Sequence, residues 1–274
     1  MMPAKLTELS PAKINLFLKI INKRKDGYHN IRSGVTLINL FDEISIEKSS
    51  NFEIKYIGNF APANNKFDNC IISRFFSEFN VTKPDYKFVI TKNIPIQSGL
   101  GSASSNLAAV LRILSKLGYK NKIKDYSKIG ADVPFFIKNS DSLIRGIGDI
   151  VINQSFPKYY FLIVKPVTNC LTSKMFKEIK SKNINFNQEF DINKITEYDQ
   201  GNDFEISVNE KFDEIASLLK FLNNLPNVIF ARLTGSGSCI FAAFESKKNA
   251  ESSLLIFKDQ FPDLWFKIVE NNFI

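Results

Sequence analysis

The chain has few of the residues that build disulfide frameworks, metal centres or membrane spans. Its 274 residues include three cysteines, one histidine and one tryptophan. Cys70, Cys170 and Cys239 stand far apart with no Cys-x-x-Cys pair, which excludes a disulfide scaffold and a cysteine-based zinc site and indicates reduced thiols. The longest apolar runs, such as residues 159–164, are too short to cross a bilayer, and the N-terminus lacks the apolar segment of a signal peptide. We therefore predict a cytoplasmic protein with no membrane partner.

The chain also lacks the dense basic tracts of nucleic-acid-binding proteins. The formal net charge is +8, but the lysines are scattered and no arginine-rich segment occurs. We predict no nucleic-acid partner, because attraction of small anionic substrates explains the sign of the charge equally well, and so does solubility. The length and the 44% hydrophobic content are sufficient for a large core and two domains.

A loop rich in glycine and serine lies between a predicted strand at residues 86–91 and a predicted helix. The helix is indicated by apolar residues at three- and four-residue steps from Leu107 to Leu117. Gly99 and Gly101 lack a Cβ, so the loop backbone can approach a ligand, and the first N–H groups of the helix attract an anion. The plain alternative is a capped helix after an ordinary tight loop. We call residues 95–105 the glycine-serine loop.

Two other phosphate-binding loops are excluded. A P-loop ends in Gly-Lys-Ser/Thr, and no lysine lies between Lys92 and Lys116. The dinucleotide pattern G-x-G-x-x-G begins at Gly99 but meets Ser104 at its third glycine.

Three further segments carry chemically notable side chains. In the strand pattern of residues 13–20, Lys13 and Asn15 lie on the same side, although a lysine there is often only solvated. His29, the single histidine, follows an Asp-Gly turn and would otherwise be an exposed loop residue. Asp132, between Gly-Ala and Val-Pro, is expected at the end of an element, where a helix cap is the alternative role. A second glycine-rich loop at residues 233–244 could be a hairpin turn.

These segments together resemble a known family. The glycine-serine loop is similar to the second motif of the GHMP kinase superfamily, P-x-x-x-G-L-G-S/G-x-S-S/A, and residues 233–244 to its third motif. P-A-K-I-N-L at residues 11–16, D-G-Y-H at residues 26–29 and G-A-D-V-P-x-F at residues 130–136 resemble one branch, the 4-diphosphocytidyl-2-C-methyl-D-erythritol kinases. The resemblance spans nearly the whole chain, from about Ser10 to Phe244.

The resemblance implies an α+β fold with two domains and an active site between them. Residues 1–156 would form an ATP-binding domain like the second domain of ribosomal protein S5, and residues 157–274 a ferredoxin-like domain. The implied reaction is phosphorylation by ATP of the 2-hydroxyl of 4-diphosphocytidyl-2-C-methyl-D-erythritol, in isoprenoid precursor biosynthesis by the non-mevalonate route. The alternatives are a homoserine or mevalonate type of GHMP kinase, or a non-catalytic nucleotide-binding protein. We expect a monomer or a weak homodimer.

The resemblance also implies the role of each site residue. Lys13 and Asp132 would be catalytic, and Ser105 would hold Mg²⁺. The expected ATP-binding residues are Pro95, Ile96, Gln97, Ser98, Gly99, Leu100, Gly101, Ser102, Ala103, Ser104 and Ser105. The expected substrate-binding residues are Asn15, Tyr28, His29, Asn106, Thr172, Phe176, Gly235, Ser236 and Gly237.

Two features of the chain remain open at this point. Ser98 and the pair Ser102-Ala103 stand where the branch carries glycine, so a positive φ at either place would add a strain of roughly 1–3 kcal/mol. The segment Asn202-Asp203-Phe204-Glu205 resembles an N-D-x-E segment of the family, but no role follows for it from the sequence.

Overall fold

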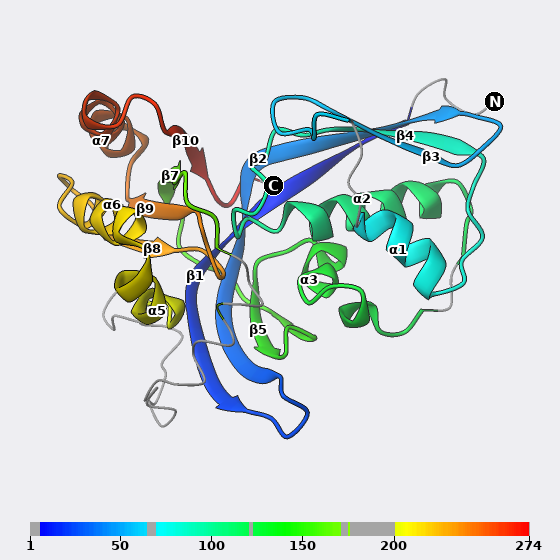
Figure 1. Cartoon of the computed structure of the whole chain (residues 1–274), viewed down its shortest axis with the longest axis horizontal. Helices are drawn as coiled ribbons and strands as arrows, with labels where there is room; N and C mark the ends of the chain where they lie inside the picture. The colour runs from blue at the N-terminus through cyan, green and yellow to red at the C-terminus, as the bar shows by residue number, and fades with distance from the viewer. Residues whose placement is uncertain (1–5, 65–69, 121–122, 171–174, 176–200, 274) are drawn as a thin grey trace. The chain divides into compact units, whose positions relative to one another are not determined.

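The computed structural model describes residues 6–64, 70–120, 123–170, 175 and 201–273 (Figure 1). They fall into two compact units made of interleaved segments. The first unit contains the chain up to Ala12, Leu40–Ile96 and Gly101–Ser140, and the second contains Lys13–Asn39, Gln97–Leu100 and the chain from Asp141 onward. Strands β1 (Leu6–Lys23) and β2 (His29–Lys48) contribute to both units. A single domain boundary at residue 156 therefore remains a prediction.

The first unit packs helices against a small sheet. The end of β2 pairs antiparallel with β4 (Tyr86–Thr91), and β4 pairs parallel with β3 (Glu53–Ile57). Helix α2 (Ser102–Lys116) contacts α1 (Ile71–Glu78) and α3 (Val133–Lys138), while a short 3-10 helix, η1 (Tyr126–Lys128), contacts α3. Their apolar faces meet strand side chains in one core, in which Phe75, Phe88 and Ile113 are fully buried. This burial is the main stabilising term for the short helix α1.

The second unit contains a four-stranded antiparallel sheet in the order β10-β7-β9-β8. These strands are β7 (Tyr160–Lys165), β8 (Phe230–Leu233), β9 (Ile240–Phe244) and β10 (Trp265–Glu270). The helices are α5 (Phe204–Lys211), α6 (Asp213–Asn223) and α7 (Lys247–Gln260). The first half of β2 pairs with β5 (Ser142–Gly146), which pairs with β6 (Ile150–Asn153).

The order β7, helices, β8, β9, α7, β10 is the β-α-β-β-α-β succession of a ferredoxin-like domain. The predicted α+β class and the ferredoxin-like part are therefore confirmed. The expected strand at residues 86–91 corresponds to β4, and the helix expected after the glycine-serine loop corresponds to α2. Among the described residues, no helix is long and apolar enough to cross a membrane.

Candidate active site

Helix α2 begins at Ser102, within the last residues of the glycine-serine loop, which confirms the predicted order of strand, loop and helix. Gly101 is the N-cap residue and has a φ of 75°, and Gly99 has a φ of 76°. Both values lie in the left-handed region, which glycine adopts without a Cβ clash. The first turn of α2 carries no acidic residue. The start of the helix therefore suits an anionic ligand.

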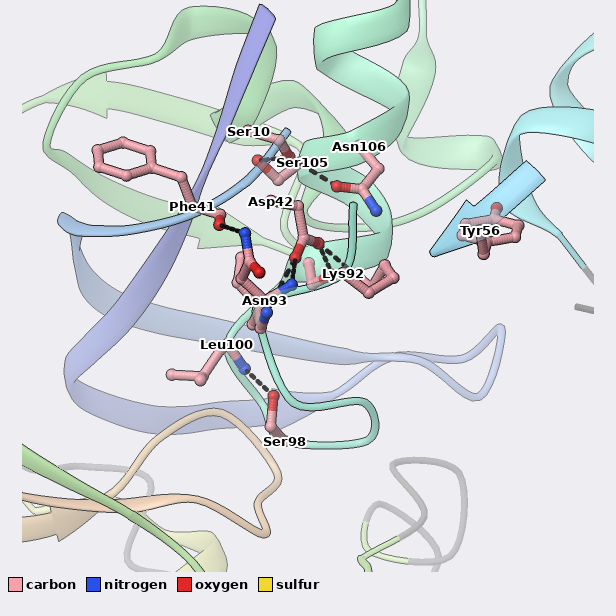
Figure 2. Close-up of polar contacts among 12 residues, drawn as sticks. Ser10, Phe41, Asp42, Tyr56, Lys92, Asn93, Ser98, Leu100, Ser105 and Asn106 are labelled. Carbon is pink, nitrogen blue, oxygen red and sulfur yellow. Dashed lines mark hydrogen bonds and ion pairs between the residues drawn. The ribbon is translucent and has the colours of Figure 1, made fainter. Parts of the chain in front are cut away.

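One buried carboxylate, that of Asp42, holds both ends of this loop (Figure 2). Its Oδ1 accepts the backbone N–H groups of Asn93 at 2.7 Å and Ile94 at 2.9 Å, just before the loop. Its Oδ2 accepts the hydroxyl of Ser102 at 2.7 Å, at the start of α2. Lys92 forms an ion pair with the same oxygen and also contacts Ser102. Burial lowers the pKa of the Lys92 ammonium, although the adjacent Asp42 acts in the opposite direction.

Ser105 and Asn106 face into the first unit. The Oγ of Ser10 lies 2.8 Å from the Oγ of Ser105 and 2.7 Å from Oδ1 of Asn106. Because an amide oxygen only accepts, Ser10 donates to Asn106 and accepts the proton of Ser105. All three side chains are almost fully buried.

The hydroxyl of Ser105 does not fit a Mg²⁺ ligand in this structure, because it is fully buried and engaged with Ser10. The residues that the structure describes contain no group of three or more His, Cys, Asp or Glu side chains that could hold a metal. Magnesium in nucleotide sites is commonly held by one or two carboxylates and the phosphates themselves, so this chemistry does not require such a group. We assign no protein ligand to Mg²⁺.

Lys13 and Asn15 form a buried pair in the second unit. Lys13 Nζ donates to Oδ1 of Asn15 at 2.5 Å, and Nδ2 of Asn15 donates to Ser33 Oγ at 2.8 Å. Lys13 is only 3% exposed, which excludes the solvated-lysine alternative. A Cβ built on Gly235 would lie 3.3 Å from Lys13 Nζ and 3.5 Å from Asn15 Oδ1. The structure thus brings together a predicted catalytic residue and two predicted substrate-binding residues.

The turn between β8 and β9, residues 234–239, packs against the glycine-serine loop. The N–H of Cys239 donates to the carbonyl of Ser98 at 3.0 Å. A Cβ on Gly99 would come within 2.2 Å of the Thr234 carbonyl oxygen. The backbone of Gly99 is therefore closely apposed to protein, whereas the sequence had suggested close approach to a ligand. Residues 234–239 do form a hairpin turn, since β8 and β9 pair antiparallel. The turn also places Gly235 beside Lys13 and Asn15.

The strain expected at the substituted glycines occurs at a different residue. Neither Ser98 nor the helical pair Ser102-Ala103 has a positive φ, whereas Gln97 has a φ of 52°.

The predicted ATP-binding residues differ in their exposure to solvent. Ile96, Gln97 and Ala103 are exposed, and Gly99, Gly101 and Ser104 are partly exposed. The buried ones are Pro95, Ser98, Leu100, Ser102 and Ser105.

Asp132 immediately precedes α3 in the first unit, at an element end as predicted. It is the N-cap residue, is partly exposed, and makes no side-chain capping hydrogen bond. Its side chain therefore does not cap the helix by a hydrogen bond, and the catalytic role remains a proposal.

Of the predicted substrate-binding residues, the structure describes Tyr28 and His29 but not Thr172 and Phe176. His29 begins β2 and is 6% exposed, so it is not an exposed loop histidine. Tyr28, in the turn before it, is 60% exposed. Thr172 and Phe176 lie outside the described residues.

Comparison with known proteins identifies the class. The family model of the GHMP kinases N terminal domain matches residues 67–151, and that of the GHMP kinases C terminal matches residues 182–263. The chain belongs to the GHMP kinases. Two curated relatives are both named 4-diphosphocytidyl-2-C-methyl-D-erythritol kinase. The one from Francisella tularensis subsp. tularensis is 32% identical over 252 residues and 88% of each chain, and the one from Buchnera aphidicola is 33% identical over 258 residues, 89% of this chain and 88% of the relative.

Solved structures show the same fold. A crystal structure of 4-(cytidine 5'-diphospho)-2C-methyl-D-erythritol kinase has a TM-score of 0.78 at 22% identity and covers 96% of this chain and 99% of that chain. The Methanococcus jannaschii mevalonate kinase has a TM-score of 0.67 at 18% identity and covers 99% of each chain. These likenesses confirm the two-domain GHMP kinase fold.

Proposed function

We propose that this chain transfers the γ-phosphate of ATP to the 2-hydroxyl of 4-diphosphocytidyl-2-C-methyl-D-erythritol, in the non-mevalonate route to isoprenoid precursors. The observation that carries the proposal is 32% identity over 88% of both chains to a protein named as that kinase. The buried Lys13–Asn15 pair and the D-G-Y-H segment support this branch over other GHMP kinases.

Phosphate binding follows from the glycine-serine loop and the start of α2. The helix N-terminus supplies backbone N–H groups and a partial positive charge, and the loop backbone supplies further donors. Phosphoryl transfer depends mainly on positioning and on stabilising the charge of the equatorial oxygens. Asp42 supports this function indirectly, because it fixes both ends of the loop.

We assign the chemical step to Lys13 and Asp132. Asp132 accepts the proton of the substrate hydroxyl as the hydroxyl oxygen bonds to the γ-phosphorus. The bond between that phosphorus and the bridging oxygen breaks, and its electron pair leaves with ADP. The ammonium of Lys13, oriented by Asn15, stabilises the negative charge of the transferred group. Magnesium bound to ATP would neutralise further phosphate charge.

Substrate selection is assigned to Tyr28, His29 and Phe176. Tyr28 is exposed, and an exposed aromatic side chain can stack on a cytosine ring. Stacking typically contributes about 1–3 kcal/mol per base and tolerates any base. Edge contacts near His29 would have to provide selectivity, because a wrong base leaves buried donors or acceptors unpaired. Thr172, Asn106, Ser236 and Gly237 are kept as substrate-binding proposals. A cytoplasmic location, the absence of nucleic-acid partners and a monomeric or weakly dimeric state likewise remain predictions.

The test is ADP release by the purified chain with a panel of acceptors: the cytidylyl substrate, its uridylyl counterpart, mevalonate and homoserine. We expect turnover with the cytidylyl substrate and a preference for it over the uridylyl compound. Turnover with mevalonate or homoserine alone would assign the chain to another kinase of the family.

Asp132→Asn distinguishes the enzyme from a non-catalytic nucleotide-binding protein. We expect this variant to lose most turnover, by about a hundredfold or more, because it lacks the proton acceptor, while ATP binding measured by calorimetry is kept. Lys13→Met provides a second variant of the same machinery. Turnover of Asp132→Asn near that of the wild type would remove the aspartate from the mechanism.

A further inference from the structure

The segment Gly201–Glu205 joins two parts of the second unit that carry site residues. The buried side chain of Asn202 uses every polar atom of its amide. Its Nδ2 donates to the carbonyl oxygens of Leu233 and Gly235, both at 2.8 Å, and its Oδ1 accepts the N–H of Phe204 at 3.0 Å. Asn202 therefore holds the end of β8 and the start of the β8–β9 turn at fixed spacing.

The same segment is also fixed to β1, the strand that carries Lys13. The N–H of Leu18 donates to the carbonyl of Gly201 at 3.1 Å, and the N–H of Asp203 donates to the carbonyl of Leu18 at 3.0 Å. The carboxylate of Asp203 accepts a hydrogen bond from the N–H of Ile20 at 2.7 Å and forms an ion pair with Lys19 at 2.9 Å. One short segment thus bonds to β1 and to the β8–β9 turn.

The turn that Asn202 holds is the one that approaches Lys13. The space beside Gly235 is bounded by Gly99 O, Lys13 Nζ and Asn15 Oδ1, at 3.2, 3.3 and 3.5 Å from an ideal Cβ. A shift of the Gly235 carbonyl would therefore change the surroundings of the Lys13 ammonium directly. In enzymes, a misplacement of the reacting groups by about 1 Å can lower the rate by roughly a hundredfold.

We propose that Asn202 is a positioning residue for catalysis: its two N–H bonds keep the Gly235 turn at the distance from Lys13 and Asn15 that the reaction needs. Asn202 itself does not contact substrate. This inference rests on the proposed kinase function for its kinetic consequence, and on the hydrogen bonds above for its structural one.

Asn202→Asp tests the proposal, because it preserves size but replaces two donors with a carboxylate facing two carbonyl oxygens. Asn223→Asp is the matched control. Asn223 also bridges to β8: its Nδ2 donates to Leu219 O at 3.0 Å and Ala231 O at 3.5 Å, and its Oδ1 accepts the N–H of Ala231 at 3.1 Å. Asn202→Ser, which keeps a small hydroxyl donor, covers the case in which the aspartate variant does not fold.

We expect the Asn202 variants to lower kcat about tenfold to a hundredfold with KM values changed less than about threefold. Asn223→Asp should keep kcat within about twofold of the wild type even if its melting temperature falls equally. Wild-type kcat in folded Asn202 variants, or equal kcat losses in the Asn202 and Asn223 variants, would overturn the proposal.

Hydrogen exchange separates this inference from the proposed function. Faster exchange at residues 234–239 in an Asn202 variant than in Asn223→Asp is expected whether or not the acceptor is correctly identified. Unchanged exchange there would overturn the positioning role. A wild-type chain inactive on every acceptor would instead contradict the proposed function.

Discussion

Replacing Gly99 with alanine should be among the most damaging single-methyl changes in the chain. The new Cβ would lie 2.2 Å from the carbonyl oxygen of Thr234 and 3.1 Å from that of Gly237, and Gly99 has a φ of +76°. The left-handed conformation alone costs about 1–2 kcal/mol for an L-residue. The clash is with backbone atoms that no rotamer change can move, so the two loops must separate, which adds about 1–3 kcal/mol. Together these terms predict a loss of about 2–5 kcal/mol.

Gly118→Ala isolates the conformational term. Gly118 has a φ of +85°, yet no atom lies within 4 Å of its ideal Cβ. Its alanine variant should lose only about 1–2 kcal/mol. The reduced freedom of the unfolded chain affects both variants similarly and cancels in the comparison. Denaturant-induced unfolding of the wild type and both variants, followed by circular dichroism and by fluorescence, provides the measurement. Equal losses for the two variants would refute the close packing of the Gly99 loop against the β8–β9 turn.

Two further substitutions, each with a control substitution, test strain and charge. Gln97→Gly should stabilise the chain by about 1 kcal/mol, because Gln97 has a φ of 52°. Ser98→Gly is the control and should destabilise the chain, because Ser98 has no positive φ. A lower melting temperature for Gln97→Gly than for the wild type would contradict the assigned backbone strain. Glu8 accepts hydrogen bonds from Arg112 and Lys116, both at 2.6 Å. Burial acts to raise the pKa of Glu8, but the hydrogen bonds outweigh burial and lower this pKa below 4.5. A folded-state pKa below the unfolded one adds stability above about pH 4.5, which is lost as the pH falls through the folded pKa. Glu8→Gln should therefore lower the free energy of unfolding near pH 7 by about 1 kcal/mol, which is measured as a lower melting temperature. In strong acid the substitution should have no such effect. Glu78→Gln, which breaks an exposed pair with Arg74, should have little effect at either pH, and a pH-independent effect of Glu8→Gln would contradict the ion-pair assignment.

Local patterns predicted the elements whose side chains repeat with a clear period. Helix α2 and strand β4 were evident because their apolar residues follow helical and strand spacing and because glycine marks the loop between them. Strands β5 and β6 and helix α5 were not predicted. Helix α5 carries almost no apolar periodicity, since only three of its residues are buried, and its place depends on contacts with α6 and β8.

Site residues could be predicted where they lie in a local sequence motif. They could not be predicted where their role depends on contacts with residues far away in the chain. Lys13 and Asn15 follow from strand alternation, which places them on one side. Asp42 could not be found in this way, because its partners Asn93 and Ser102 are 51 and 60 residues away in the chain. No local pattern distinguishes such an aspartate from one on a solvated strand. The role of Asn202 likewise depends on carbonyl groups more than 30 residues away.

The bonds made by Asp42 turn the glycine-serine loop into a closed ring. The chain leaves the carboxylate at Ile94 and returns to it at Ser102, so the number of residues between those two points is fixed by one acceptor group. Side chains inside such a ring can be exchanged, as Ser98, which stands where the resembled branch carries glycine, illustrates. An added or deleted residue has to be absorbed inside the ring or break a bond to Asp42. The loop should therefore tolerate changes of composition far better than changes of length.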